Sequence, residues 1–376
     1  MSALNLPFDA GQMLAGLRPW VECESPTWDA GAVSRMMDLA ARDLSAIGAH
    51  VDTIPAMGGF GSSIRATFPH ARQGQPGILV SGHLDTVHPI GTLDKLPFRV
   101  EDGLAWGPGI MDMKGGNYVF LEAMRQIGRA GLTTALPVTF LFTPDEEVGT
   151  PATRGLIEDA ARGQRAVLVP EPARPDGGAV TGRYAIARFD LLTEGRPSHA
   201  GWALKDGRSA IAAMARRILQ IEAMTTEDCT FSVGVIHAGQ WVNCVSSTCR
   251  AEVLSMAKTQ EDLDRGIAAM LALQGCEKGV DFIVTRGVTR PVWEPQPGTM
   301  ALYDLARGLS AQIGFDLTAA SAGGGSDGNF TGAMGVPTLD SIGVRGRGLH
   351  TLDEHIEIAS LPERARLAAG LLTQIA

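Results

Sequence analysis

Short apolar runs alternate with helix-like segments through the first half of the chain, and this alternation constrains the possible folds more than any other feature. Residues 77–80, 137–142 and 166–169 have the length and apolar composition of buried strands. Apolar side chains at helical spacing occupy the segments before and between these runs, namely residues 10–49, 117–129 and 152–162. This alternation predicts an α/β fold, in which helices cover both faces of a mostly parallel sheet.

The pattern changes after the turn-rich residues 174–178, which read RPDGG. The next hundred or so residues read as strands at 184–193, 229–235, 251–256 and 280–285 and as helices at 209–224 and 260–273. Helices at residues 299–313 and 361–374 then follow, with the same kind of apolar pattern as the helices of the first half. We therefore expect a main α/β domain formed by residues 1–181 and 290–376, interrupted by a smaller α+β domain at residues 182–289.

The composition is that of a globular protein without a polyanionic partner. The 376 residues are 45% hydrophobic and 19% charged, which excludes a disordered chain. Lys and Arg number 32 against 41 Asp and Glu, so the net charge is −9 and we expect no nucleic-acid partner and no anionic membrane partner. The 46 glycines predict many tight turns and close backbone contacts.

The cysteines and the first residues bear on the compartment. The five cysteines are odd in number and form no Cys-x-x-Cys, so we expect free thiols in a reducing compartment. Residues 1–20 lack a basic segment followed by an apolar run, and no apolar stretch reaches the roughly 18 residues of a membrane span. We therefore expect a cytoplasmic protein with no signal peptide and no membrane span.

Each of the three predicted buried strands is followed by a histidine or by acidic residues. His83 and Asp85 follow the first strand and project from the same face, because residues two apart on a strand share a side. The acidic residues 145–147 follow the second strand, and Glu171 follows the third. A lone His-x-Asp is usually a surface feature, and an acidic turn can simply be solvated. Because open α/β sheets bind ligands at the carboxyl ends of their strands, we expect these groups to share one edge.

Two further residues complete the set. Asp112 lies in a glycine-rich segment directly before a helix, where it can bridge two metal ions or simply cap the helix. His350 lies near the C-terminus. In such a set one carboxylate can bind a metal ion while its neighbour acts as a general base on water. Histidines and carboxylates without cysteine match a hydrolytic dinuclear zinc site better than a structural zinc site.

Seven motifs in a fixed order resemble one enzyme family. The resemblance covers the chain from about Trp20 to the end, and its motifs read SGHLDTV, GPGIMDMKGG, TPDEEVG, VPEP, GRPSHAG, GGGSDGNF and GLHTLDEHIEI. The chain resembles the dinuclear zinc peptidases and amidohydrolases of carboxypeptidase G, acetylornithine deacetylase, succinyl-diaminopimelate desuccinylase and aminoacylase. It is most similar to the carboxypeptidase G type. The resemblance implies a zinc-exopeptidase-like catalytic domain, with residues 182–289 as a lid that also makes a homodimer.

The resemblance also implies roles for the clustered residues. Two zinc ions per chain, with cobalt or manganese as substitutes, would be bound by His83, Asp112, Glu147, Glu171 and His350. Asp112 would bridge the two ions and precede a cis peptide bond to Met113. Asp85 would clamp the ring of His83, and Glu146 would be the general base. His199 would stabilise the oxyanion.

The implied reaction is hydrolysis of an amide bond next to a free carboxylate. A hydroxide held by two zinc ions would attack the amide, and a C-terminal amino acid, glutamate in the carboxypeptidase G type, would be released. Substrate contacts are implied for Asn243, Arg290, Gly324, Gly325 and Ser326. Arg290 is the clearest partner for the substrate carboxylate, because guanidinium pairs with carboxylate in a bidentate way.

The substrate assignment has alternatives. Residues 254–256 read Leu-Ser-Met where family members often have Asp-x-Arg, and no lysine follows Glu171 to meet a substrate carboxylate. An N-acyl-amino-acid deacylase (aminoacylase), a dipeptidase and a catalytically silent binding protein are the other interpretations. Trp202, Trp241 and Trp293 either line an apolar acyl pocket or simply pack in a core or interface.

Overall fold

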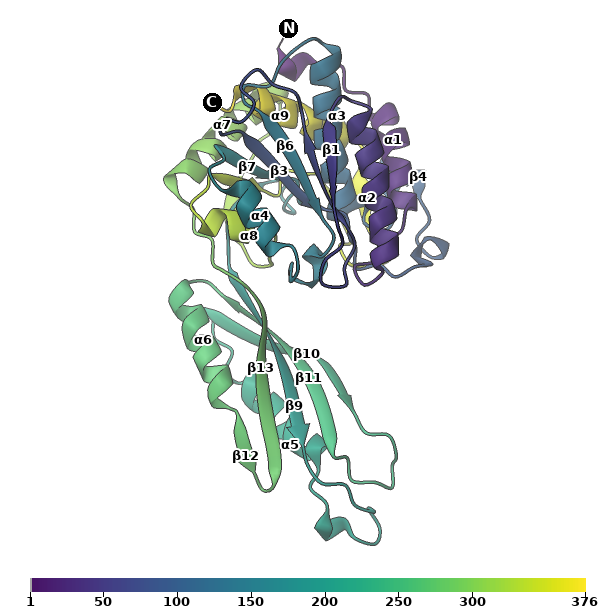
Figure 1. Cartoon of the computed structure of the whole chain (residues 1–376), viewed down its shortest axis with the longest axis vertical. Helices are drawn as coiled ribbons and strands as arrows, with labels where there is room; N and C mark the ends of the chain where they lie inside the picture. The colour runs from purple at the N-terminus through teal and green to yellow at the C-terminus, as the bar shows by residue number, and fades with distance from the viewer. Residues whose placement is uncertain (1) are drawn as a thin grey trace. The chain divides into compact units, whose positions relative to one another are not determined.

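A computed structural model of the chain describes residues 2–376, which form two units of different architecture (Figure 1). Unit 1 comprises the residues up to Gly182 together with Glu294–Ala322 and Ser326–Ala376. Unit 2 comprises Arg183–Trp293 and Gly323–Gly325. The second unit therefore continues past residue 289, where the sequence pattern places its limit, and it includes part of the glycine-rich loop.

Within the described residues, an eight-stranded sheet forms the centre of unit 1. In spatial order its strands are β1 (His50–Ile54), β2 (Ser63–Thr67), β6 (Val138–Thr143), β3 (Ile78–His83), β7 (Ala166–Val169), β15 (Thr338–Asp340), β8 (Ala179–Arg183) and β14 (Ala319–Ala322). The adjacent strands β6, β3, β7 and β15 are parallel, whereas β2 pairs antiparallel with β1 and β6, and β8 with β15. The predicted α/β fold is confirmed, and its three predicted strands lie side by side in the middle of the sheet.

Helices pack on both faces of this sheet (Figure 1). Ile78 and Val80 of β3 point into a core shared with α1 (Ala10–Glu22), α3 (Gly115–Arg129) and α9 (Ser360–Gln374). Leu79, between them, packs against Ile157 and Ala161 of α4 (Arg154–Ala161). This division follows from the two-residue period of a strand. Unit 1 also contains α2 (Ala30–Ser45), α7 (Pro297–Ile313) and α8 (Gly328–Ala333).

The helical pattern over residues 10–49 forms two helices rather than one. Asp29 begins α2, and its carboxylate accepts a hydrogen bond from the backbone of Ala32 at 2.9 Å. In the connection before it, Pro26 pairs with Thr86 in a parallel bridge, and the Thr86 amide donates to the Ser25 carbonyl at 2.8 Å. Proline and the residue before it disfavour the helical conformation, so the chain breaks here and follows the loop after β3 instead.

A smaller antiparallel sheet joins two distant parts of unit 1. In spatial order its strands are β16 (Gly346–Arg347), β17 (His355–Glu357), β5 (Leu104–Trp106) and β4 (Arg99–Glu101). These strands were not predicted, because two or three residues carry too little periodicity to be recognised. Their pairing brings the segment that contains His350 next to the segment that leads to Asp112.

Unit 2 is built on a five-stranded antiparallel sheet. In spatial order its strands are β10 (Cys229–Ala238), β11 (Thr248–Ala257), β9 (Ala185–Glu194), β13 (Val280–Arg290) and β12 (Gly275–Glu277). Along β9, Ala187, Phe189 and Leu191 are buried, whereas Arg188 and Asp190 are exposed. The helices α5 (Ala210–Glu222) and α6 (Gln260–Ala272) both pack on the buried face.

Two predictions about cysteines and membrane segments can be compared with this structure. All five cysteines are free thiols, as expected from their number and spacing. Within residues 2–376, none of the helices combines the length and the apolar composition that crossing a bilayer requires.

Candidate metal centre

His83 ends β3 and is almost fully buried at the carboxyl end of the parallel strands. The side-chain nitrogen of Asn117, on α3, donates a hydrogen bond to the His83 carbonyl oxygen at 2.7 Å. The helix can approach this closely because residue 82 is glycine, where an added Cβ would lie 2.1 Å from Asn117 Oδ1. Glycine at residue 82 therefore permits the close packing that holds the backbone of His83.

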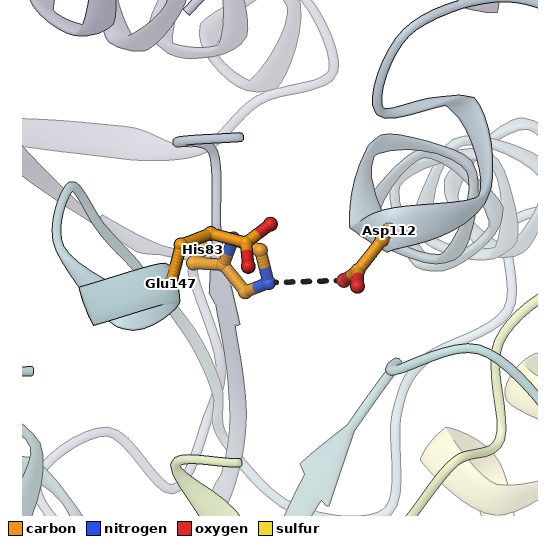
Figure 2. Close-up of side chains that lie close together, drawn as sticks. All are labelled: His83, Asp112 and Glu147. Carbon is orange, nitrogen blue, oxygen red and sulfur yellow. Dashed lines mark ion pairs between the residues drawn. The ribbon is translucent and has the colours of Figure 1, made fainter. Parts of the chain in front are cut away.

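The two ring nitrogens of His83 face different groups. Nδ1 lies 3.0 Å from the Asp85 carbonyl oxygen and 3.4 Å from Asp85 Oδ1, so the predicted clamp uses the main chain as well as the carboxylate. Nε2 is buried and faces Asp112 Oδ1 at 3.3 Å, Glu171 Oε1 at 3.7 Å and Glu146 Oε2 at 3.9 Å. Figure 2 shows the ring directed at Asp112, with Glu147 beside it.

Asp85 also positions the acidic turn that follows β6. Its carboxylate accepts hydrogen bonds from the backbone amides of Glu146 and Glu147, both at 3.2 Å, and from Thr27 Oγ1 at 2.8 Å. A single buried carboxylate therefore connects the histidine-bearing strand to the turn that carries Glu146 and Glu147. The prediction of a clamp for His83 describes only part of this role.

Asp112 lies between two histidines. It belongs to an irregular turn, η3 (Ile110–Lys114), and the peptide bond from Asp112 to Met113 is cis, as the family resemblance implies. Its Oδ1 faces His83 Nε2 and its Oδ2 faces His350 Nε2, each at 3.3 Å. His350 Nε2 also lies 3.3 Å from Glu147 Oε2. The structure thus brings all five predicted metal ligands together in unit 1.

One residue of this centre, Glu354, has no role in the sequence analysis. It is buried, and its Oε1 accepts hydrogen bonds from the backbone amides of Met111 at 2.8 Å and Asp112 at 3.1 Å. Its Oε2 accepts from the Gly109 amide at 2.9 Å and lies 2.6 Å from His88 Nε2. Glu354 therefore holds the turn that presents Asp112. In the sequence, the one indication that Glu354 belongs to the site is its position four residues after His350, in the same motif.

The centre carries more carboxylates than positive groups. Burial and the charge of Asp112 raise the pKa of Glu147 to about 8, and the same two causes raise the pKa of Glu171 well above its usual range. The pairing of His350 with Asp112 and Glu147 raises the pKa of that histidine to about 10. Burial lowers the pKa of His83, but its ion pairs with Asp112 and Asp85 and the charge of Glu171 outweigh burial and raise the pKa well above the usual range. Such a set is incomplete without further positive charge.

The residues present fit a metal ion. Two groups of three potential ligand atoms lie within 4.8 Å of one another, one formed by His83, Asp112 and Glu147 and the other by His83, Glu146 and Glu171. His83 Nε2 and Glu147 Oε1 are buried and have no hydrogen-bond partner among the described residues, which is costly unless a cation binds there. Histidine and carboxylate donors suit a hydrolytic zinc site. Glu146, the predicted base, lies within the second group, so distance alone does not separate a base from a ligand.

Unit 2 places two of its predicted residues side by side. The backbone amide of Ala200, next to His199, donates to the Asn243 carbonyl oxygen at 2.9 Å. His199 is exposed, and its Nδ1 accepts hydrogen bonds from the backbone amides of Gly201 and Trp202, both at 3.2 Å. Because Nδ1 is an acceptor, the neutral ring carries its proton on Nε2.

The predicted carboxylate partner, Arg290, is buried at the end of β13. The glycine-rich loop packs against it, since an added Cβ at Gly325 would lie 2.5 Å from Arg290 Cδ. The Gly324 carbonyl oxygen accepts a hydrogen bond from Arg183 Nη1 at 3.1 Å. Glycine at residue 325 therefore permits a close approach of the loop to the arginine side chain.

Other predicted contact residues are divided between core and surface. Ser326 lies in unit 1, is fully buried, and forms a hydrogen bond to Asp340 through its hydroxyl. Trp293 is buried, so it packs in the core rather than lining an acyl pocket. Trp202 and Trp241 are among the exposed apolar residues of unit 2.

Comparisons with known proteins agree on a family. The sequence matches peptidase family M20/M25/M40 over residues 79–374. It is 33% identical over 319 residues to carboxypeptidase G2 of Pseudomonas sp. (strain RS-16), covering 81% of this chain and 75% of that protein. It is 27% identical over 386 residues to the succinyl-diaminopimelate desuccinylase of Gluconacetobacter diazotrophicus, covering 95% of each. The solved structure of aminopeptidase PepT from Bacillus cereus matches with a TM-score of 0.77 at 21% identity, over 98% of this chain and 99% of that one.

Fold, site and relatives together define a hydrolytic metalloenzyme. The chain belongs to peptidase family M20/M25/M40, a family of metal-dependent and typically zinc-dependent peptidases and amidohydrolases. The resemblance inferred from the seven motifs is confirmed.

Proposed function

We propose that this chain hydrolyses an amide bond next to a free carboxylate and releases a C-terminal amino acid. The observation that carries the proposal is the position of Asp112, whose two carboxylate oxygens face His83 and His350 at 3.3 Å each. A carboxylate between two imidazoles is the arrangement expected of a ligand shared by two metal ions. The identity with carboxypeptidase G2 over most of the chain supports amide-bond chemistry.

Two zinc ions per chain are proposed, with cobalt or manganese as substitutes. His83 and Glu171 would bind one ion, His350 and Glu147 would bind the other, and Asp112 would be shared. The pairwise distances support this division, with 3.7 Å from His83 Nε2 to Glu171 Oε1 and 3.3 Å from His350 Nε2 to Glu147 Oε2. When bound, such ions polarise the substrate carbonyl and lower the pKa of water.

Glu146 is the proposed general base. Its backbone amide is held by Asp85 Oδ1 at 3.2 Å, and its Oε2 lies 3.9 Å from His83 Nε2, so its carboxylate is fixed beside the ligands. A carboxylate there can take a proton from the attacking water and return it to the leaving amine. Glu147 instead faces His350, which supports a ligand role for Glu147 and leaves the proton transfer to Glu146.

Residues of unit 2 are proposed to act on the substrate. His199 would donate a hydrogen bond from Nε2 to the negative charge that develops on the carbonyl oxygen, and the two amides bound to its Nδ1 support this tautomer. Arg290 would pair with the free carboxylate of the substrate. Further proposed contacts come from Asn243, Gly324, Gly325 and Ser326.

Unit 2 is also proposed as the lid and as the interface of a homodimer. Its β10 is an edge strand of the sheet, and Ile236 on that strand is half exposed. Leu219 on α5 and Trp241 and Val242 after β10 are more exposed still. Unpaired strand edges and clustered exposed apolar side chains are typical of interfaces. Light scattering is expected to give the mass of a dimer, and a monomer at high concentration would contradict this part of the proposal.

An amine-release assay tests the reaction. The panel consists of N-acyl amino acids and dipeptides varied on both sides of the amide. We expect chelation to abolish the activity, added Zn²⁺ to restore it, and metal analysis to give two ions per chain. Less than one ion per chain with no metal-restorable activity would contradict the proposal and favour a silent binding protein. Activity on N-acyl amino acids but not on peptides would identify an aminoacylase.

A further inference from the structure

A cavity of about 460 Å³ in unit 1 adjoins the candidate metal centre. Its lining includes Thr27, Trp28, Val87, Pro89, Ile90 and Glu147. Glu147 is also a proposed metal ligand, so a group bound in this cavity lies beside the amide bond that the metal centre would act on. None of the residues assigned to substrate binding lines this cavity.

The walls of the cavity are held to each other by the backbone. The Thr27 amide donates to the Thr86 carbonyl at 3.2 Å, and the Thr86 amide donates to the Ser25 carbonyl at 2.8 Å. The segment that carries Val87, Pro89 and Ile90 is held at its end by Glu24, whose carboxylate accepts a hydrogen bond from the Gly91 amide at 2.9 Å. The cavity is therefore formed in advance, as is usual for small-molecule sites.

The rim of the cavity is apolar and faces solvent. Trp28 is 77% exposed, Ile90 is 54% exposed and Val87 is 41% exposed. The ring of Trp28 packs on Phe60 with centroids 5.3 Å apart, which fixes the indole without covering it. Large apolar side chains gathered around a cavity beside a reaction centre are typical of a ligand surface.

The described lining residues offer no cationic side chain to an anionic group. Among the described residues that line the cavity there is no lysine and no arginine, and the charged members are Asp29 and Glu147. The Asp29 carboxylate already accepts a hydrogen bond from Ala32 at the start of α2. A carboxylate entering here would lose its solvation without gaining a cationic side-chain partner, whereas an apolar group gains by leaving water.

We propose that this cavity binds the acyl part of the substrate and selects uncharged apolar acyl groups, aromatic or aliphatic, over acyl groups that end in a carboxylate. The inference rests on the proposed function and names its substrate class. The amino-acid side of the substrate carries the free carboxylate, for which the described residues of this cavity provide no cationic side chain, so the acyl side occupies the cavity. Trp28, Val87 and Ile90 are the specificity-determining residues. A succinyl group, the acyl group of the desuccinylase relatives, is disfavoured here.

The experiment varies the acyl group on one amino acid, the best one from the amine-release panel. The substrates carry acetyl, hexanoyl, benzoyl and succinyl groups. We expect kcat/KM for the benzoyl or hexanoyl substrate to exceed that for the acetyl substrate by about tenfold or more, and the succinyl substrate to be the poorest. A succinyl substrate that equals or exceeds the benzoyl substrate would overturn the inference.

Variants of the rim assign the preference to this cavity. Val87→Ala and Trp28→Ala should each reduce kcat/KM for the apolar acyl substrates several-fold and leave the acetyl substrate nearly unchanged. Val100→Ala is the matched control, because Val100 is an exposed valine on β4 outside the cavity. Ile90→Lys adds a cation and should raise the succinyl rate relative to the benzoyl rate. The assignment would be overturned if these variants changed kcat/KM only when the amino acid of the substrate is varied and not when the acyl group is varied.

A binding measurement separates this inference from the proposed function. Calorimetry with the Glu146→Gln variant and an N-benzoyl amino acid should show binding that Trp28→Ala weakens about tenfold. If the enzyme hydrolyses no acyl substrate but this Trp28-dependent binding is present, the cavity assignment stands and the proposed function fails. If it hydrolyses all acyl substrates alike and Trp28→Ala does not change binding, the assignment fails and the proposed function stands.

Discussion

The candidate histidines His83 of unit 1 and His199 of unit 2 lie in opposite environments. In unit 1 His83, Glu146 and Glu171 are buried, and Asp85 and Glu354 hold the backbone that carries the acidic groups. In unit 2 His199 is exposed, and its ring accepts hydrogen bonds only from its own loop among the described residues. The centre in unit 1 is therefore held by contacts between distant segments, whereas the ring of His199 in unit 2 is held by its own loop.

This difference separates two kinds of sensitivity. Apart from the proposed base Glu146, a change in the centre of unit 1 should affect metal binding, chemistry and stability together, because the same hydrogen bonds serve all three. A change in unit 2 should affect turnover or assembly without altering the metal content. Four variants or conditions test this separation, and they follow in order of expected effect.

Replacing the proposed base should have the largest effect. We expect Glu146→Gln to lower kcat by about 10²–10⁴, because a positioned general base contributes that much, while the metal content stays unchanged. Amine release and metal analysis on one preparation measure both quantities. Glu101→Gln on the exposed β4 is the control. Loss of an ion with the activity would instead make Glu146 a ligand, as its presence in one ligand group allows.

Replacing the histidine of unit 2 should lower the rate without disturbing the fold. We expect His199→Ala to reduce kcat by about 10²–10³, the effect of removing one oxyanion donor. The melting temperature and the zinc content should not change, because the side chain is exposed. His50→Ala provides a matched exposed histidine on β1. An unchanged kcat would remove His199 from the reaction.

The support for Asp112 should matter less than the ligands themselves but should be measurable. Glu354→Gln leaves the shape but loses one acceptor for the backbone of the Asp112 turn and the pairing with His88. We expect zinc affinity to fall about 10–100-fold, as for other residues that orient metal ligands, and competition with a chelator measures it. Unchanged affinity would mean that the turn holds its conformation without Glu354.

The pH dependence of the metal-free protein should show the smallest effect. Glu147 has a pKa of about 8 in the folded protein against its ordinary value of 4.5, so the folded state holds an extra proton between these values. Stability is therefore fully present at low pH and is lost as pH rises toward about 8. The raised pKa values of His83 and His350 act in the same direction above about pH 6.5.

The measurement is the melting temperature of chelated protein between about pH 5 and about pH 8, with and without added Zn²⁺. We expect it to fall with pH in the chelated sample and to recover with zinc, most strongly at the upper end. Glu147→Gln should flatten the decline. A melting temperature that rises through this range without metal would contradict the electrostatic description of the centre.

The regular elements of unit 1 were predictable because their signals are local. The continuous apolar runs before His83, Glu146 and Glu171 have the length and composition of buried strands, and they form β3, β6 and β7. The division of residues 10–49 into two helices was not predicted, although Pro26 is a local signal for a break. The pairing of this break with the loop after β3 is visible only in the structure. The short strands β4, β5, β16 and β17 are stabilised by pairing between distant segments rather than by periodicity of their own.

The sequence by itself determined the family and the residues proposed for the chemistry. Histidines and carboxylates at the ends of buried strands indicate a metal centre. The seven motifs that contain them, in their fixed order, identify the family. Tertiary structure decided how those residues are held. Glu354 supports the Asp112 turn and Trp28 forms the rim of a cavity only because segments far apart in the chain pack together. Spacing along a chain shows which groups a strand presents, but a hydrogen bond or a cavity wall depends on distances in space.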